Sequence, residues 1–217
     1  MDRRVKSKVF IVNGHSLLRE LLGQFINRQP DMVVCGTAED ASRALTKIRL
    51  LKPDIAIIDL SLKHSHGMDL IKDLQIRHPK MPVLVLSTHD ESHFAERSLR
   101  AGARGYITTY EVTDKVLSVI RQVLAHGMYV SENLAARIAR RSLDTRETGS
   151  GSPFEALSDR ELQVFELMGR GYGTQQIART LSLGVRTVNT YRSRIKEKLG
   201  VEHSAALMRQ AFQWTEN

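Results

Sequence analysis

Residues 55–62 are Ile-Ala-Ile-Ile-Asp-Leu-Ser-Leu, and this stretch decides the fold of the first half of the chain. Four consecutive apolar residues predict a strand that is buried on both faces, as strands in parallel sheets are. Asp59 follows the run directly, so a carboxylate stands at the carboxyl end of the predicted strand. Open α/β sheets place their functional groups at this edge. We therefore expect an α/β fold with Asp59 at its working edge.

The same pattern recurs on both sides of this stretch, because each short apolar run is followed by a segment with helical spacing. Strands are predicted at 9–12, 32–36, 55–58, 83–86 and 105–107, and helices at 17–26, 40–50, 68–76, 92–100 and 112–124. Five such βα units predict a doubly wound, five-stranded parallel sheet with helices on both faces. Asp40 is placed to cap the second helix. The first helix is indicated by apolar residues at helical spacing, Leu17, Leu18, Leu21, Leu22 and Phe25.

Several polar residues join Asp59 just after, or at the end of, the predicted strands. They are Asn13, Gly14, His15, Ser87 and Thr109. Because the carboxyl ends of parallel strands meet at one edge of a sheet, these residues are expected to lie together. We expect Asp59 to accept hydrogen bonds from Asn13 or Ser87 there.

Composition narrows the classes of function. The chain has 217 residues, 41% of them apolar, which suits two ordinary domains. Its formal net charge of +8 predicts an acidic partner. Nucleic acid is the favoured candidate, and an anionic membrane is the second candidate. Cys35 is the single cysteine and lies in an apolar run, so we predict a buried thiol and no disulfide.

With no signal peptide and no membrane span in the sequence, a cytoplasmic protein is expected. No motif of an enzyme class is present, so we expect no enzyme activity.

The chain is predicted to divide into an α/β domain over 6–126, a helical segment with a flexible linker over 127–153, and an all-helical domain over 154–217. The middle segment has an arginine-rich helical pattern from Leu134 to Leu143. It is followed over 144–153 by a polar stretch that ends in Gly, Ser and Pro, which is typical of a linker.

The third segment contains a short helix, a glycine turn and a longer helix, which is the helix-turn-helix arrangement. Ser158 and Glu161 form a capping-box pair at the start of a first helix that ends near Gly169. Helices are then predicted at about 174–181, 185–199 and 204–214. The apolar residues expected to pack the middle two are Ile177, Ala178, Leu181, Val185, Val188, Ile195 and Leu199.

The other face of the longer helix is polar and basic. The residues predicted to contact DNA are Arg186, Thr187, Asn189, Thr190, Arg192, Ser193, Arg194 and Lys196, and Lys198 shares the face. Basic side chains suit phosphates, whereas Asn, Thr, Ser and Arg near the amino end of the helix suit base edges in the major groove. An ordinary solvated basic face is the alternative interpretation of the same pattern.

The third segment resembles the LuxR/GerE-type helix-turn-helix. The matching residues are Leu157-Ser158, Arg160-Glu161, Val164, Gly171, Ile177-Ala178, Leu181, Thr187-Val188, Tyr191-Arg192, Ile195 and Lys198-Leu199-Gly200-Val201. The resemblance implies binding to double-stranded DNA. That family usually has Lys at the position of Asn189 and His at that of Tyr191, so a changed or weaker base contact is expected at Asn189. Its final helix commonly dimerises, and Leu207, Ala211 and Trp214 form either that seam or the domain core.

The first domain resembles the receivers of NarL/FixJ-type response regulators. The matching residues are Val12, His15, Leu17, Arg19-Glu20, Asp54, Asp59-Leu60-Ser61-Leu62, Gly67 and Gly102-Ala103-Arg104-Gly105-Tyr106. The resemblance implies a flavodoxin-like receiver fold in which Asp59 holds the position of the phosphoryl acceptor. A carboxylate can act as that nucleophile, and the reaction needs a divalent cation.

The sequence departs from the receiver pattern at three charged positions. The family has two acidic residues where this chain has Asn13 and Gly14, and a lysine where it has Thr109. Asp59 and the backbone carbonyl of Ser61 alone make a poor Mg²⁺ site, since Mg²⁺ prefers anionic oxygen ligands. We call the site formed by Asn13, Gly14, Ser87, Tyr106 and Thr109 around Asp59 the receiver pocket. Ordinary Mg²⁺-dependent phosphorylation of Asp59 is predicted to be lost or very slow.

Five histidines, His15, His64, His66, His89 and His93, fall near the same edge of the predicted sheet. His15 is ordinary for the family and the others are predicted to be exposed loop residues, so no metal site is expected.

The leading hypothesis is a DNA-binding transcription regulator that acts as a homodimer, with a receiver that responds to something other than phosphate. The helix over 112–124 and the strand before it are the expected pairing surface. The alternatives are a phosphate-switched response regulator that uses Asp59 and a sensor kinase, and an adaptor that sequesters a partner regulator.

Overall fold

The computed structural model describes residues 6–110, 113–143 and 153–216, without the side chains of 113–114 and 141–143. The chain divides into two compact units, 1–144 and 145–217. Residues 144–152 of the predicted linker and the predicted helix start at Val112 lie outside the described residues. Each unit is described below by itself.

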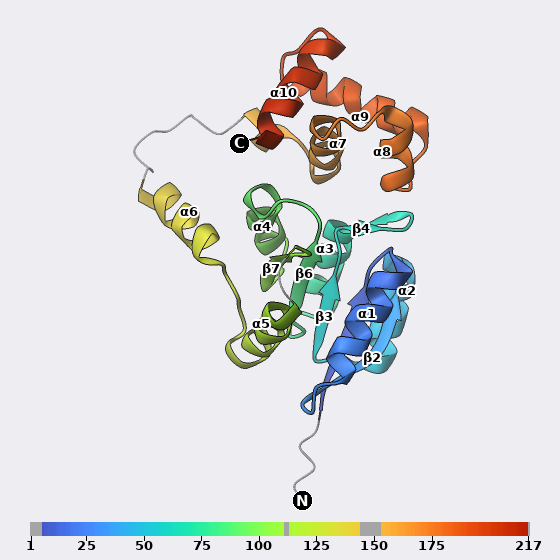
Figure 1. Cartoon of the computed structure of the whole chain (residues 1–217), viewed down its shortest axis with the longest axis vertical. Coiled ribbons are helices and arrows are strands. Elements are labelled where there is room, and N and C mark those ends of the chain that lie inside the picture. Colours follow the sequence, from blue (N-terminus) through green and yellow to red (C-terminus); the bar gives the residue numbers. More distant parts are fainter. Residues whose placement is uncertain (1–5, 111–112, 144–152, 217) are drawn as a thin grey trace, which may run out of the picture. The chain divides into compact units, whose positions relative to one another are not determined.

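The first unit is built on a five-stranded parallel sheet, as predicted (Figure 1). Its strands are β1 (Ser7–Val12), β2 (Met32–Ala38), β3 (Ile55–Ile58), β6 (Val83–Ser87) and β7 (Gly105–Thr108), in the order β2-β1-β3-β6-β7. β1 lies beside β3 with Val12 opposite Ile58, so Asn13 and Asp59 leave the sheet side by side. The register of β6 against β7 pairs Ser87 with Thr108 at the same edge.

Among the described residues of this unit, six helices accompany the sheet. They are α1 (Ser16–Asn27), α2 (Ala41–Leu51), α3 (Gly67–Arg77), α4 (Glu91–Arg100), α5 (Thr113–His126) and α6 (Glu132–Leu143). The predicted cap is present, since Asp40 accepts a hydrogen bond from the backbone N–H of Arg43 at 2.8 Å. α6 contacts α4 and buries Leu134.

Alternate residues of the strands face opposite layers of helices. Val9 and Ile11 of β1 pack with Leu22 and Ile26 of α1 and with the apolar side of α5. Phe10 points the other way, toward Leu51 at the end of α2. Both faces of the sheet are thus covered, which is the reason for the continuous apolar runs.

The prediction of a buried Cys35 is wrong, and the apolar positions of α1 do not all lie on one buried face. Leu17, Leu21 and Phe25 on α1 are 66%, 43% and 39% exposed, because α1 carries two apolar stripes and only the one with Leu22 and Ile26 faces the sheet. Cys35 is half-buried rather than buried, since it lies on β2, the edge strand.

A small hairpin that the sequence did not suggest follows β3. β4 (Ser61–Leu62) and β5 (Ser65–His66) pair antiparallel, and His64 in the turn has a φ of +54°. Strands of two residues leave no detectable alternation in sequence. The hairpin matters because it stands next to Asp59.

The second unit is helical, as predicted. It contains a short 3₁₀ turn (Pro153–Ala156), α7 (Asp159–Gly169), α8 (Thr174–Thr180), α9 (Val185–Lys198) and α10 (Ser204–Glu216). Ser158 and Glu161 form the predicted capping box. α7 and α10 approach so closely that a Cβ on Gly169 would lie 2.3 Å from the carbonyl oxygen of Ala211. Within the described residues, no helix combines the length and the apolar character needed to cross a membrane.

The final helix closes the core of its own unit, which decides between the two alternatives for its apolar residues. Leu207 and Ala211 are fully buried, and the ring of Trp214 lies 6.0 Å from that of Phe154 and 5.6 Å from that of Phe165. Val185, expected in the core, is 44% exposed because it is the first residue of α9.

Candidate functional site

Asp59 is buried at the carboxyl edge of the sheet, and its carboxylate accepts hydrogen bonds from three neutral donors. Its Oδ2 accepts a hydrogen bond from Asn13 Nδ2 at 2.9 Å. Its Oδ1 accepts from Ser87 Oγ and from the backbone N–H of Ser61, both at 3.1 Å. The hydrogen bonds expected from Asn13 and Ser87 are therefore both present. Asp59 is only 3% exposed.

The protonation of Asp59 is governed first by this burial. Loss of hydration raises the pKa of the Asp59 carboxyl, and the hydrogen bonds from Ser61 and Ser87, with the nearby His89, offset part of the increase. No charged donor is bonded to the carboxylate among the described residues.

Asn13 is held in one orientation by its two neighbours. Its Oδ1 accepts a hydrogen bond from the backbone N–H of His15 at 2.7 Å, so its Nδ2 is the atom that faces Asp59. The guanidinium of Arg19 donates to the Asn13 carbonyl. An amide nitrogen is not a metal ligand, and the amide oxygen is already engaged. This donor set fits Mg²⁺ poorly.

Gly14 lies against the β4–β5 hairpin. A Cβ at this position would stand 3.1 Å from the carbonyl oxygen of Ser61 and 3.4 Å from the backbone nitrogen of Lys63. The hairpin is held in place by Lys63, which forms an ion pair with Glu39 at 2.8 Å. A side chain at position 14 would therefore require the hairpin to shift by a few tenths of an ångström.

The other residues of the receiver pocket come from β6 and β7. The backbone N–H of Thr109 donates to the carbonyl of Ser87 at 2.9 Å, which places a neutral hydroxyl residue where the family has a lysine. Tyr106 is buried, and its hydroxyl donates to the carbonyl of His89 at 2.9 Å. The structure therefore brings all six predicted residues to one edge of the sheet.

Two of the histidines predicted to be exposed are buried, so that prediction is wrong. His89 is 4% exposed; its Nε2 lies 3.0 Å from Ser61 Oγ and its ring 4.7 Å from that of Phe94. His66, also 4% exposed, caps α3 by accepting a hydrogen bond from the backbone N–H of Met68 at 3.0 Å. Within the described residues no three His, Cys, Asp or Glu side chains gather as metal ligands.

The contact between Ser61 and His89 was missed by the sequence reasoning. It joins the hairpin after β3 to the segment after β6 across the mouth of the receiver pocket. The available signal is position alone, since Ser61 lies three residues beyond the end of β3 and His89 two residues beyond the end of β6.

The residues predicted to contact DNA lie on α9, most of them exposed. Val188 and Ile195 face the core, and α8 packs against α9 through Ile177. The exposed residues are Arg186, Thr187, Asn189, Thr190, Ser193 and Arg194. The Thr190 hydroxyl donates to the Arg186 carbonyl at 3.0 Å, which leaves its oxygen lone pairs outward.

Three basic residues of α9 serve its packing. Arg192 is half-buried and donates to Thr174 Oγ1 at 2.6 Å, which ties α9 to the start of α8. Lys198 forms an ion pair with the buried carboxylate of Glu161 at 2.7 Å, which ties α9 to α7. Lys196 is half-buried and donates to the Glu202 carbonyl at 3.5 Å. The strongest phosphate contacts are therefore expected from Arg186 and Arg194.

Comparison with known proteins matches both units of the chain. Residues 9–121 match the response regulator receiver domain, and residues 155–211 match the bacterial regulatory proteins of the luxR family. The response regulator GacA of Pseudomonas aeruginosa is 32% identical over 200 residues, 92% of each chain. The oxygen regulatory protein NreC of Staphylococcus aureus is 31% identical over 209 residues, 94% of this chain and 96% of NreC.

Solved structures show the same fold. RcsB from Salmonella enterica serovar Typhimurium, bound to a promoter with a phosphomimetic, superimposes with a TM-score of 0.63 at 20% identity, over 95% of this chain and 98% of RcsB. A LuxR-family response regulator from Aurantimonas matches with a TM-score of 0.59 at 28% identity, over 64% of this chain and all of its own. The chain therefore belongs to the response regulators in which a receiver domain precedes a LuxR-family helix-turn-helix DNA-binding domain.

Proposed function

We propose that this response regulator binds duplex DNA through α9 as a homodimer, and that its receiver works without ordinary Mg²⁺-dependent phosphorylation of Asp59. The observation that carries the proposal is the hydrogen bond from Asn13 Nδ2 to Asp59 Oδ2. A neutral amide fills the place beside the acceptor carboxylate where a cation bound by acidic residues would stand.

The neighbouring residues support the same conclusion. An incoming phosphoryl group brings negative charge that needs compensation by a metal ion or a cation. Asn13 and Gly14 contribute no carboxylate for a metal, and Thr109 contributes no cation. The carboxylate of Asp59 would also have to give up hydrogen bonds before it could attack.

Labelling with a small phosphodonor tests the receiver. The full-length protein is incubated with acetyl phosphate and Mg²⁺ and analysed by intact-protein mass spectrometry, with Asp59→Ala as the control. We expect no mass increase of one phosphoryl group in either protein. Robust labelling that disappears in Asp59→Ala would establish the conventional phosphate-switched regulator instead.

Measurement of DNA affinity tests the proposed DNA binding and its independence of phosphorylation. Affinity for fragments selected from a genomic pool by the protein itself is measured with and without Mg²⁺ and beryllium trifluoride. We expect tight, salt-dependent binding that the reagent leaves unchanged. A marked increase in affinity would contradict phosphate independence, and absence of salt-dependent binding would favour an adaptor that acts by sequestering another regulator.

Pairing of two copies is proposed to use α1. Its outer stripe, formed by Leu17, Leu21 and Phe25, has the spacing of one helix face and is 66%, 43% and 39% exposed. By contrast, α5, the helix expected from sequence to pair, turns polar residues such as Lys115 and Arg121 outward. A two-fold axis brings the same surface of two copies together, so an exposed apolar stripe on one helix can pack against its own counterpart. A second copy of the chain is therefore the simplest partner that would cover this stripe.

A further inference from the structure

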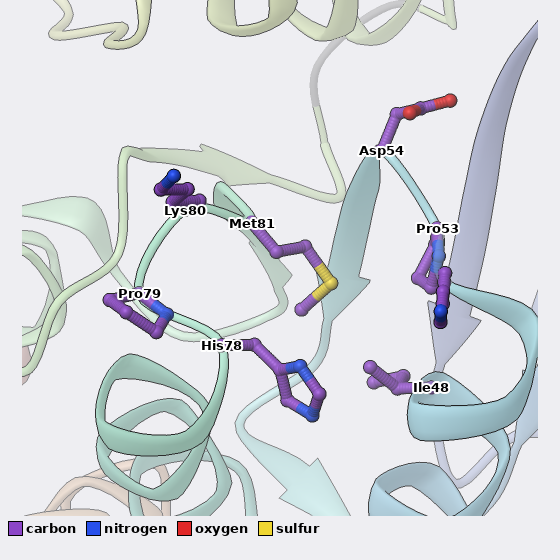
Figure 2. A pocket seen from close by; sticks show the side chains of 8 residues that line it. Ile48, Pro53, Asp54, His78, Pro79, Lys80 and Met81 are labelled. Carbon is purple, nitrogen blue, oxygen red and sulfur yellow. The ribbon is translucent and has the colours of Figure 1, made fainter.

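A hollow of about 460 Å³ lies at the edge of the sheet opposite Asp59 (Figure 2). Its walls are the segment that enters β3, with Lys52, Pro53 and Asp54, and the segment that enters β6, from His78 to Met81. Figure 2 shows the side chains of Ile48, His78 and Met81 pointing toward the same space. Its volume lies in the range of small-molecule pockets, roughly 300–1,000 Å³.

A second hollow of about 320 Å³ adjoins the first, and His78 lines both. It lies between α2 and α3 and is lined by Leu45, Thr46, Arg49 and Arg77. The two hollows form one depression along the α2–α3 side of the receiver, with His78 between them.

The depression carries a concentration of positive charge. Arg49, Lys52, Arg77 and Lys80 are all exposed at its rim. In the part of the chain that the structure describes, none of these four cations is held in an ion pair. Arg49 and Arg77 lie in the last turns of α2 and α3, where each offsets part of a helix dipole. Mutual repulsion of the four cations still favours an anion supplied from outside.

The carboxylate lining the larger hollow is partly engaged elsewhere. Asp54 Oδ2 accepts a hydrogen bond from the backbone N–H of Lys8 at 2.7 Å, which turns that oxygen toward β1. Positive charge therefore prevails at the rim. The floor, in contrast, is apolar: Ile48 and Pro53 are buried there and Met81 is half-buried.

We infer that this depression is a binding site for a nucleoside phosphate, with the base on the apolar floor of the larger hollow and the phosphates among the four cations. An apolar floor beneath a cationic rim matches a molecule with a flat, weakly polar part and a polyanionic part. The site is independent of Asp59 and of α9, so it stands or falls separately from the function proposed above.

Calorimetric titration of the full-length protein tests the site. ADP, GDP, UDP, inorganic pyrophosphate and adenosine are titrated in the absence of Mg²⁺. We expect saturable one-to-one binding of at least one nucleotide. Pyrophosphate should bind about tenfold or more weakly, because it cannot use the floor, and adenosine should show no measurable binding.

Variants assign the binding to the depression. Lys52→Ser combined with Lys80→Ser should weaken nucleotide binding by about tenfold or more, since charge-assisted hydrogen bonds are lost. The matched control is Lys115→Ser with Arg140→Ser, which removes two exposed cations from α5 and α6 and should leave the affinity unchanged. Thermal unfolding of each variant verifies that the fold is retained.

Several outcomes would overturn the inference. Absence of saturable binding of all three nucleotides is one, and nucleotide affinity no higher than that of pyrophosphate is another. Full affinity in the Lys52→Ser, Lys80→Ser protein would place the bound nucleotide elsewhere, such as on α9. An equal loss of affinity for random-sequence duplex DNA in that protein would identify the depression as a contact for the nucleic-acid backbone.

Discussion

The side-chain amide of Asn13 donates to the Asp59 carboxylate at 2.9 Å, and its oxygen is fixed by the backbone N–H of His15 at 2.7 Å. Because Asn13 cannot turn its amide without losing both bonds, it acts as a fixed donor to Asp59. Burial raises the pKa of the Asp59 carboxyl, and hydrogen bonds from Ser61 and Ser87 offset part of that increase. The pair therefore stabilises one arrangement of the receiver pocket.

Asn13→Asp should convert this contact into a repulsion that a divalent cation relieves. Two buried carboxylates at hydrogen-bond distance destabilise the receiver by roughly 1–3 kcal/mol at neutral pH. Mg²⁺ should then restore the lost stability, because the variant offers it two anionic oxygens. Thermal unfolding with and without Mg²⁺ measures both effects. The natural protein should show no Mg²⁺-dependent change in its unfolding temperature.

Asn13→Ala serves as the control for this experiment. It removes the donor without adding charge, so it should destabilise the receiver and remain insensitive to Mg²⁺. An equal Mg²⁺ response in the natural protein, Asn13→Ala and Asn13→Asp would show that the cation binds elsewhere. The role given to Asn13 would then be incorrect.

Asn189 and Arg194, both exposed on α9, should differ in how their loss affects DNA binding. Arg194→Ala should weaken binding to every sequence and lower the slope of log affinity against log salt by about 1, as expected for one lost phosphate contact. Asn189→Ala should instead reduce discrimination between the selected site and its point variants by about 1–3 kcal/mol. Fluorescence anisotropy at several salt concentrations separates the two effects.

One result would contradict the proposed base contact of Asn189. If Asn189→Ala weakens selected and random duplexes by the same factor, Asn189 does not contact base edges. Glu197→Gln, a change at an exposed position of α9 outside the predicted DNA contacts, provides a measure of nonspecific perturbation.

Glu161 should make the second unit sensitive to acid. Burial by itself would raise the pKa of Glu161, but hydrogen bonds from Lys198 and from the backbone of Ser158 outweigh it and hold the pKa below the ordinary value of 4.5. Ionised Glu161 therefore contributes stability above that value, and the contribution is lost as the pH falls through the lowered pKa. Glu161→Gln should destabilise the protein by about 1 kcal/mol at neutral pH.

Chemical unfolding at neutral pH and below pH 4.5 measures this linkage. The difference between the natural protein and Glu161→Gln should shrink as the pH falls. A constant difference across the range would mean that the ionisation of Glu161 contributes nothing to stability. Glu197→Gln, at an exposed position of α9, is the control that should show little difference at either pH.

Most of the fold could be predicted because each level of the sequence pattern agrees with the next. The run from Ile55 to Ile58 is apolar at every position, which predicts a strand buried on both faces, and β3 is such a strand, paired in parallel with β1. The same reasoning places Asp59, Asn13 and Ser87 at one edge without any knowledge of side-chain contacts.

The sequence does not predict which of several similar faces of a helix becomes buried. Leu18 and Leu21 both occupy apolar positions of α1, and the sequence does not distinguish them. Leu21 is 43% exposed because the orientation of α1 on the sheet determines which leucines face the core. Arg192 and Arg194 are likewise both basic residues of α9. Arg192 bonds to Thr174, a contact from a different helix, and that distinction has no local signal.

Charge placed on the outer stripe of α1 should separate paired copies of the protein. Leu21→Glu puts a carboxylate at the centre of the stripe, where a second copy would present its own, so desolvation and repulsion both oppose pairing. Because Leu21 is 43% exposed, the fold itself should be nearly unaffected. Sedimentation velocity should show the dimer constant weakened by about tenfold or more. The control is Ile76→Glu on α3, where the side chain is 79% exposed but stands outside the stripe. A natural protein that stays monomeric at high concentration, or equal weakening by both changes, would remove α1 as the pairing surface.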